Sequence, residues 1–155
     1  MVAGLAALDV LDREGLIQRA ETMGNRIGEG LRALVPRFEF LKEVRWRGLM
    51  LGIEFGPPKS LGLSAAWALI HKLDKSLFPQ AALIPLLDQH HILAQVAGHH
   101  VDVIKLLPPL VISDEDVSWF LSAFEQVMVQ LHRFPGPALD VVTNIGRLAL
   151  TNRAR

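Results

Sequence analysis

The strongest hydrophobic pattern in the chain lies within residues 113–131. Apolar side chains recur there at offsets of 0, 3, 4, 7, 10, 11 and 14, the spacing of a helix with one broad apolar face. These residues are Val117, Phe120, Leu121, Phe124, Val127, Met128 and Leu131. Ser113 precedes three acidic residues, and its hydroxyl can accept the N–H of Asp116 while the carboxylates face the positive end of the helix dipole. The pattern predicts a long helix that starts after Ser113 and packs its apolar face on a sheet.

Two further helices are predicted at the start of the chain. Apolar residues at helical spacing indicate one helix over residues 2–12, and Gly15 separates it from a second helix over residues 16–35. The apolar stripe of the second helix consists of Ile17, Ala20, Met23, Ile27, Leu31 and Leu34. The first helix has no Ser, Thr, Asp or Asn cap before it, and a missing cap costs about 1 kcal/mol. We therefore expect the first helix to continue a longer chain upstream.

The period of the pattern changes to two in residues 40–55, where apolar and polar side chains alternate on both sides of Gly48. This alternation predicts two strands with a bend at Gly48. Another strand is expected over residues 103–107, and the proline pair that follows ends it because proline donates no backbone hydrogen bond. A single charged residue, Lys105, interrupts the apolar residues of this strand.

Between these strands, helical segments are expected over residues 64–77 and 79–89, the second of them kinked by Pro85. A strand should follow residues 90–94. If the turn before it requires a positive φ at His91, histidine there costs on the order of 1 kcal/mol. Together the elements predict an α+β fold, in which a small, mainly antiparallel sheet of three or four strands packs against helices.

Composition and charge exclude several classes of protein. Half of the 155 residues are apolar and 21% are charged, which suits one globular domain that buries about 70% of its unfolded surface. Prolines around Gly136 break the pattern, so we divide the chain into a domain over residues 1–133 and a helical tail over residues 134–155. The 16 basic residues balance the 16 acidic ones, which gives no electrostatic reason to bind nucleic acid or an anionic membrane.

The chain also lacks the signals of a membrane or secreted protein. Its longest apolar run, residues 81–87, is far shorter than the ~20 residues that cross a bilayer. The first residues carry no basic segment with a cleavage pattern, so we expect no signal peptide. The absence of cysteine excludes a disulfide framework and a thiol nucleophile, and it fits a cytoplasmic location.

Histidines and acidic clusters are the candidates for chemistry that the chain itself offers. The histidines at positions 90, 91, 99 and 100 are of the type that binds zinc. Adjacent side chains on extended backbone point to opposite faces, and no carboxylate accompanies them at a ligand spacing, so loop histidines are favoured over a metal site. The acidic residues near positions 9–14 and 114–116 lie at predicted helix ends, where capping and the helix dipole explain them without catalysis.

Two segments carry longer phrases. Residues 44–55 read VRWRGLMLGIEF, and residues 103–112 read VIKLLPPLVI. They resemble the phrases V-R-G-x-G-L-M-x-G-I-E-F and V-I-R-L-x-P-P-L-x-I of class-III, ornithine/acetylornithine-type, pyridoxal-phosphate aminotransferases. Trp46 replaces the first glycine of one phrase, and Lys105 replaces the arginine of the other. The resemblance covers nearly all of residues 1–132 and is specific to the C-terminal small domain of the family.

The resemblance implies the small domain of a fold-type I enzyme that transfers an amino group from an amine or amino acid to a 2-oxo acid. It also implies a substrate-binding role for Lys105, since the family arginine usually helps to hold a substrate carboxylate. A lysine keeps the positive charge and loses the planar fork, so recognition would be less directional. The alternative for Lys105 is a strand residue whose stem packs on apolar neighbours while its ammonium group reaches water.

In this family the lysine that binds pyridoxal phosphate and its acidic partner belong to the large domain. The five lysines of the chain are Lys42, Lys59, Lys72, Lys75 and Lys105. None has the glycine-rich setting of the family's catalytic lysine, so we expect no catalytic or cofactor-binding residue and no transamination by this chain alone. Its expected partners are the large domain and a second subunit of a homodimer. The alternative is a non-enzymatic interaction or dimerisation module, with the apolar side of the C-terminal helical tail and the uncapped first helix as its binding surface.

Overall fold

The structure, a computed structural model, describes residues 2–73, 77–99 and 101–132. Its elements along the chain are α1 (Val2–Arg13), α2 (Leu16–Leu34), the short 3₁₀ helix η1 (Val35–Arg37), β1 (Leu41–Arg47), β2 (Met50–Phe55), α3 (Leu61–Leu73), α4 (Leu77–His90), β3 (Gln95–Val96), β4 (Val103–Leu106) and α5 (Asp114–His132). The predicted helical tail over residues 134–155 and the domain boundary at residue 133 lie outside the described residues.

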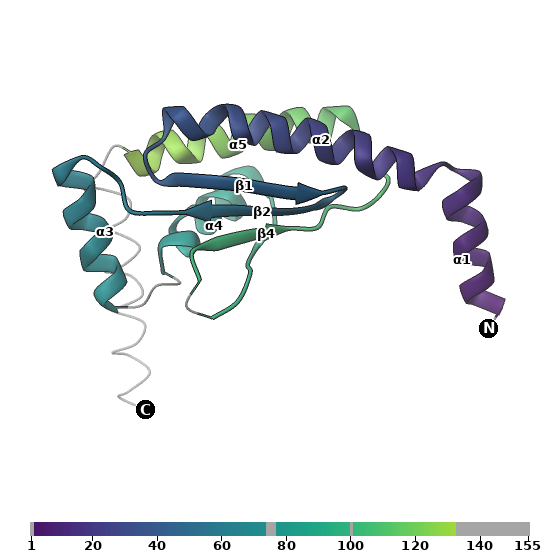
Figure 1. The fold of residues 1–155 in the computed structure, drawn as a ribbon, viewed down its shortest axis with the longest axis horizontal. Helices are drawn as coiled ribbons and strands as arrows, with labels where there is room; N and C mark the ends of the chain where they lie inside the picture. Colours follow the sequence, from purple (N-terminus) through teal and green to yellow (C-terminus); the bar gives the residue numbers. More distant parts are fainter. Residues whose placement is uncertain (1, 74–76, 100, 133–155) are drawn as a thin grey trace.

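The strands form one antiparallel sheet in the order β1-β2-β4-β3, which confirms the predicted α+β fold (Figure 1). The bend between β1 and β2 lies at Gly48, as predicted, and this glycine has a φ of +53°. Such a φ is favourable for glycine and costly for most other residues. The tight connection sets the register of the first two strands, in which Val44 faces Ile53 and Arg47 faces Met50.

Helices α2 and α5 run side by side over one face of the sheet (Figure 1). The predicted apolar stripe of α5 is confirmed: every member is buried except Leu121, which is half-buried against the core. Alternate residues of β2 and β4, including Ile53 and Ile104, belong to the same core. The apolar periods of the helices and the strands therefore meet in one buried layer.

The helix α2 departs from its predicted pattern at its first turn. The prediction is wrong for Ile17, whose side chain is 61% exposed, whereas Ile27 and Leu31 on the same stripe are buried. In addition, Gly24 and Gly28 are buried. A Cβ at Gly24 would overlap the carbonyl of Gly48, and a Cβ at Gly28 would overlap the ring of Trp46. The two glycines let α2 lie close against β1 and its bend.

Helix α3 begins three residues earlier than predicted. The carboxylate of Glu39 accepts the backbone N–H groups of Lys59 and Ser60, each at 2.8 Å, and so caps the start of this helix. These two hydrogen bonds lower the pKa of Glu39, with the Ser60 N–H as the largest cause. A cap supplied from the segment before β1 cannot be read from the residues next to the helix.

Beyond α3, the second predicted helix of this region is confirmed as α4 with Pro85 inside it. His91 ends α4 with a φ of 56°, which is the left-handed conformation considered for this turn. The strand expected after it is β3, which has only two residues.

Helix α1 extends from one end of the molecule (Figure 1). It contacts α2 but buries none of its own residues, and Val2, Leu5 and Leu8 are 60% exposed or more. Among the residues described, no helix has the length and apolar character needed to cross a bilayer.

Candidate functional site

Lys105 lies in the middle of β4, between Gly52 of β2 and Gln95 of β3. Its neighbours Ile104 and Leu106 are buried, whereas Lys105 itself is half-buried. Because side chains alternate along a strand, Lys105 is on the face opposite to these core residues. The side chain of Lys105 is thus partly covered without belonging to the core.

A cavity of about 530 Å³ lies beside Lys105 at the β3 edge of the sheet. Its walls are mostly apolar and include Leu107 at the end of β4 and Trp119 on α5. Among the described residues that line it, Lys105 is the only cation. A concave apolar site with one basic group suits a ligand that has an apolar body and a carboxylate.

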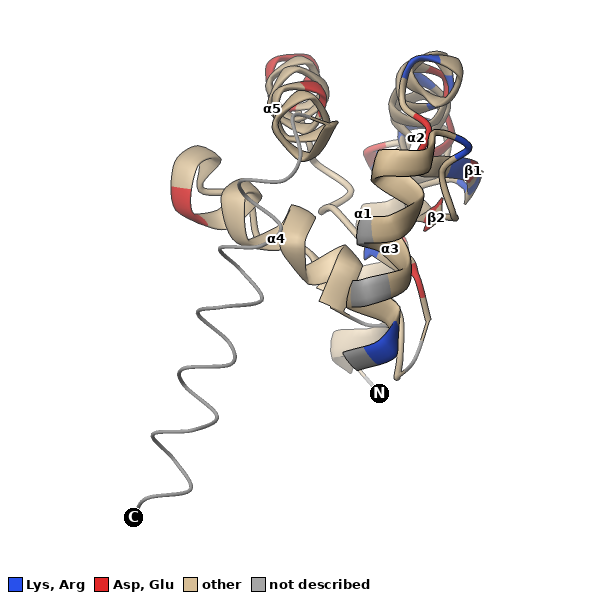
Figure 2. Cartoon of the chain, turned by 90° about the vertical axis from the view of Figure 1, so that its left-hand side faces the viewer, with Lys and Arg blue, Asp and Glu red and all other residues tan. Residues whose placement is uncertain are grey.

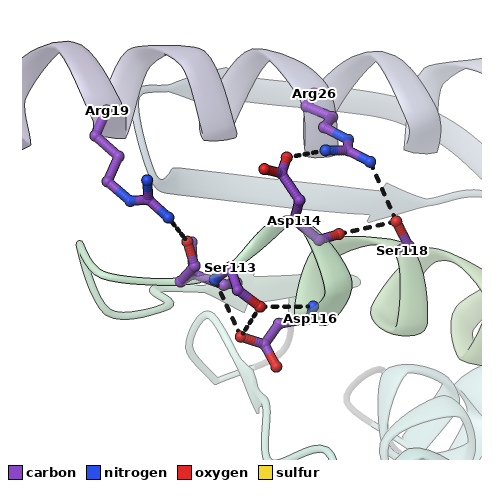
Figure 3. A network of polar contacts seen from close by, with 7 residues as sticks. Arg19, Arg26, Ser113, Asp114, Asp116 and Ser118 are labelled. Carbon is purple, nitrogen blue, oxygen red and sulfur yellow. Dashed lines mark hydrogen bonds and ion pairs between the residues drawn. The ribbon is translucent and has the colours of Figure 1, made fainter.

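The other charged residue at this cavity, Asp116, is already engaged as a helix cap (Figure 3). Its carboxylate accepts the hydroxyl of Ser113 at 2.6 Å and the Ser113 backbone N–H at 3.0 Å. In return the Asp116 N–H donates to the Ser113 hydroxyl oxygen at 3.1 Å, which confirms the predicted start of α5. The hydroxyl and then the backbone hydrogen bond from Ser113 lower the pKa of Asp116, so this carboxylate is ionised.

Helix α2 fixes the turn that forms one wall of the cavity. The Arg19 guanidinium donates to the carbonyl oxygen of Ile112 at 2.5 Å, and Arg26 pairs with Asp114 and donates to Ser118 at 3.2 Å (Figure 3). The Arg26 pair is exposed and contributes less than about 1 kcal/mol to stability. The pair instead fixes positions, because it links the start of α5, next to the cavity wall, to the centre of α2.

The lysines in the described part of the chain do not fit a site for pyridoxal phosphate. Lys42 forms an ion pair with Glu54 at 2.6 Å, and Lys59 and Lys72 are exposed. Lys105 is half-buried, and Asp116, the acid that lines the same cavity, forms the cap of α5 with Ser113 rather than an ion pair with Lys105 in the described part of the chain. The amine and free carboxylate that this cofactor requires are therefore not brought together among these residues.

A second group of polar residues was not predicted from the sequence. His71 of α3 and Asp102, which lies immediately before β4, are within hydrogen-bonding distance, with 2.9 Å from Nε2 to a carboxylate oxygen. They line a second cavity of about 420 Å³, together with Trp67 and the Lys42–Glu54 pair. The two residues are 31 positions apart and share no sequence motif, so only the packing of α3 brings them together.

The predicted loop histidines do not gather into a metal site in the described regions, where no group of three His, Asp or Glu side chains is placed to hold an ion. His91 occupies the turn after α4, and His99 is exposed. His100 lies outside the described residues. The charged side chains are instead concentrated on α2, β1 and the start of α5, while α4 carries a single acidic residue (Figure 2).

Comparison with known proteins gives consistent matches to transaminases. The family described as aminotransferase class-III matches residues 1–128. The diaminobutyrate–2-oxoglutarate aminotransferase of Rhizobium meliloti is 33% identical over 138 residues, which cover 86% of this chain and 27% of that protein. The chain thus spans about a quarter of the length of this relative.

Solved structures show the same part of the fold. The acetylornithine aminotransferase of Elizabethkingia anophelis is 29% identical with a TM-score of 0.57, over 81% of this chain and 27% of that one. A transaminase from the marine bacterium Virgibacillus has a TM-score of 0.66 at 20% identity, over 82% of this chain and 27% of that one. The predicted resemblance and the fold-type I architecture are confirmed.

Proposed function

The chain belongs to the class-III aminotransferase family, and we propose that it acts as the C-terminal small domain of such an enzyme. The reaction is amino-group transfer from an amine or amino acid to a 2-oxo acid. Pyridoxal phosphate is held by a large domain on other polypeptide, because the described lysines here do not form its site. The chain alone is inactive.

The observation that carries this proposal is the position of Lys105 in β4. This residue is the only cation among the described residues that line the apolar cavity of about 530 Å³. In the assembled enzyme the ammonium group of Lys105 pairs with a carboxylate of the amino acid or 2-oxo acid. A lysine makes this contact as a point charge, without the fixed two-bond geometry that arginine provides.

The partners of the domain are the large domain and a second subunit, and the assembled enzyme works in the cytoplasm. The exposure of helix α1 supports the existence of such a partner. Leu5 and Leu8 are 64% and 60% exposed although they lie on the apolar side of the helix. A row of apolar side chains that is exposed in one chain usually marks a surface that another protein covers in the assembly.

Absorption spectroscopy tests the first part of the proposal. The full chain is mixed with pyridoxal phosphate and then with an amino donor. We expect the spectrum of the free cofactor and no amino-group transfer. A stoichiometric lysine adduct that exchanges with the donor would show that the chain is a complete enzyme.

A fusion tests the role of the domain. The chain replaces the matching region of the Rhizobium meliloti relative, and transamination is measured for a carboxylate substrate and for a carboxylate-free amine. We expect Lys105→Ala to raise the KM for the carboxylate substrate about tenfold or more, because a charge-assisted hydrogen bond is lost. Lys105→Arg should restore or improve this KM. The KM of the amine is the matched control and should not change.

The alternative function is a non-enzymatic interaction module that uses α1 as its binding surface. The exposed apolar side of α1 favours this reading as well. Size-exclusion chromatography over a range of concentrations separates the two. A self-sufficient module should remain monodisperse, whereas a small domain without its large domain should self-associate through α1.

A further inference from the structure

Helix α4 has an apolar outer side that the described residues leave exposed. Its first eleven residues read LFPQAALIPLL, in which Gln80 is the one polar side chain, and the helix contains no Lys or Arg (Figure 2). Phe78 and Leu86 face the core and are buried. On the outer side, Ile84 is 39% exposed and Leu87 is 46% exposed. A helix that is apolar on every side is typically enclosed by protein, so we expect a partner for the outer side of α4.

The polypeptide that begins nearest to this side is the segment that follows α5. Helices α4 and α5 pack against each other, and their last turns are joined, because the side-chain amide of Gln130 donates to the side-chain oxygen of Gln89 at 3.0 Å. The chain therefore leaves α5 beside the end of α4, within about two helical turns of Ile84 and Leu87. The sequence Pro-Gly-Pro at residues 135–137 cannot continue α5 and favours a turn.

The sequence of this segment is typical of a helix with one apolar side. Apolar residues recur after the prolines at offsets of 0, 3, 4, 7, 10 and 11, and they are Ala138, Val141, Val142, Ile145, Leu148 and Ala149. Thr143 and Arg147 fall on the opposite side of such a helix. Pro137 suits its first position, because proline has no N–H that would need a partner there.

The length of the segment also fits the outer side of α4. A helix over residues 138–150 would be about 20 Å long, whereas the part of α4 around Ile84 and Leu87 occupies about 10 Å. The match to the aminotransferase family covers residues 1–128, so the segment lies beyond the part of the chain that the family comparison explains. Its apolar pattern therefore needs a role of its own.

We propose that residues 138–150 form an amphipathic helix that docks on the outer side of α4 in the same chain. Ile145 and Leu148 cover Ile84 and Leu87, and the apolar surfaces of both helices are removed from water. The occupant is the chain's own segment rather than a second copy, because a short connection from the end of α5 gives it a high effective concentration at α4. This docking is independent of the proposed transaminase function, and it leaves the exposed side of α1 available for the large domain.

Hydrogen exchange of the full chain, at a concentration where it is monomeric, tests the docking. We expect the amides of residues 138–150 to be protected, because a helix of this length without a packing partner is marginal in water. Ile145→Asp places a charge on the docking side and should accelerate their exchange about tenfold or more, through the loss of one buried side chain. Thr143→Asp, on the opposite side of the helix, is the matched control and should leave the exchange unchanged. Exchange at the rate of an unstructured chain in the unmodified protein would overturn the proposal.

Variants of α4 show whether the protection comes from this helix. Leu87→Ser changes a side chain that is exposed in the described part of the chain, so the fold should tolerate it. The substitution should nevertheless accelerate exchange of residues 138–150, because it removes part of their docking surface. Asp88→Ser alters the neighbouring exposed residue and is the matched control. Protection of residues 138–150 that is the same in Leu87→Ser and in the unmodified chain would place the segment elsewhere and refute the proposal.

Cross-linking identifies the occupant. The chain contains no cysteine, so a pair of introduced cysteines reacts without background. Leu87→Cys combined with Ile145→Cys should be joined within one chain by a short bismaleimide, and Leu87→Cys combined with Thr143→Cys should react several-fold less. Cross-links that form mainly between two chains would assign the outer side of α4 to a second copy, and equal reaction of the two pairs would show no docked orientation. Either result would contradict the proposal.

Discussion

Helices α1 and α5 have similar apolar periods and opposite surroundings. The helix α5 begins with a hydroxyl–carboxylate cap and buries seven side chains, while α1 has an apolar side with no buried residue. Both are helical in the structure, so the local pattern is sufficient for helix formation in each. What differs is whether another surface covers the apolar side.

The difference between α1 and α5 bears directly on the function proposed for the chain. The chain spans 27% of the relative from Rhizobium meliloti, and α1 is the α-helix that has no buried residue in the described part of the chain. A small domain that normally lies against a large domain should have such an element. Substitutions in the two helices would show whether α1 and α5 differ as much in solution as in the structure.

Truncation of a buried side chain in α5 should have the largest effect. Phe124 is fully buried, and Phe124→Ala should lower the free energy of unfolding by about 3–5 kcal/mol because it leaves a cavity. Leu8→Ala in α1 removes a side chain that is 60% exposed and, at protein concentrations where the chain is monomeric, should change stability by less than about 0.5 kcal/mol. Denaturant unfolding of both variants measures the difference.

The same pair of variants also sharpens the functional proposal. In the fusion with a large domain, Leu8 should become buried, and Leu8→Ala should then cost about 2–5 kcal/mol. A cost near zero in the fusion would mean that α1 has no partner there. A large cost in the isolated chain would mean that α1 is already covered, for example by self-association.

The glycines of α2 provide the next prediction. Gly24→Ala places a methyl group against the backbone carbonyl of Gly48 and should destabilise the chain by about 1–3 kcal/mol. Gly4→Ala in α1 meets no atom within 4 Å and should stabilise its helix by about 0.5–1 kcal/mol, since alanine is the better helix former. Thermal unfolding followed by circular dichroism measures both the loss of stability in Gly24→Ala and the gain in Gly4→Ala. Destabilisation by Gly4→Ala would show that α1 packs closely against something.

Removal of the α5 cap should have a smaller effect. Ser113→Ala eliminates the acceptor of the Asp116 N–H and one donor to the Asp116 carboxylate, with an expected cost of about 1 kcal/mol. Ser122→Ala, on the exposed side of α5, is the matched control, and its effect should stay within about 0.5 kcal/mol. Denaturation midpoints of the two variants give the comparison.

The smallest effect is expected from the pH dependence of His132 at the end of α5. Burial lowers the pKa of His132, although Glu39 partly opposes this shift. The neutral ring also accepts the Glu39 backbone N–H at 3.2 Å. A histidine with a lowered pKa binds fewer protons than it does in the unfolded chain. Its contribution is therefore present above about pH 6.5 and is lost as the pH falls through the folded pKa.

Unfolding midpoints at about pH 7.5 and about pH 5.5 test this expectation, in a range where carboxylates remain ionised. The unmodified chain should be less stable at the lower pH, and His132→Phe should reduce the difference. Greater stability of the unmodified chain at the lower pH, unaltered by the His132→Phe change, would contradict the assignment.

The sequence alone determined the features that depend on neighbouring residues. The cap at Ser113, the bend at Gly48, the ends of α1 and α2, and the apolar stripe of α5 all follow from short-range geometry and hydrogen bonding. The family phrases around β2 and β4 likewise identified Lys105 as a candidate site residue from the sequence alone. The role of Lys105 in substrate binding stays a prediction.

Only the tertiary structure decided the contacts between residues that are distant in the chain. Glu39 caps α3 from another segment, and Gly24 meets Gly48 across two elements. Ile17 is exposed although it lies on the predicted apolar stripe of α2, whereas its neighbour Leu16 is buried. The His71–Asp102 pair is of the same kind. A periodic pattern specifies which side of an element is apolar, but the partner that covers that side depends on how all the elements pack.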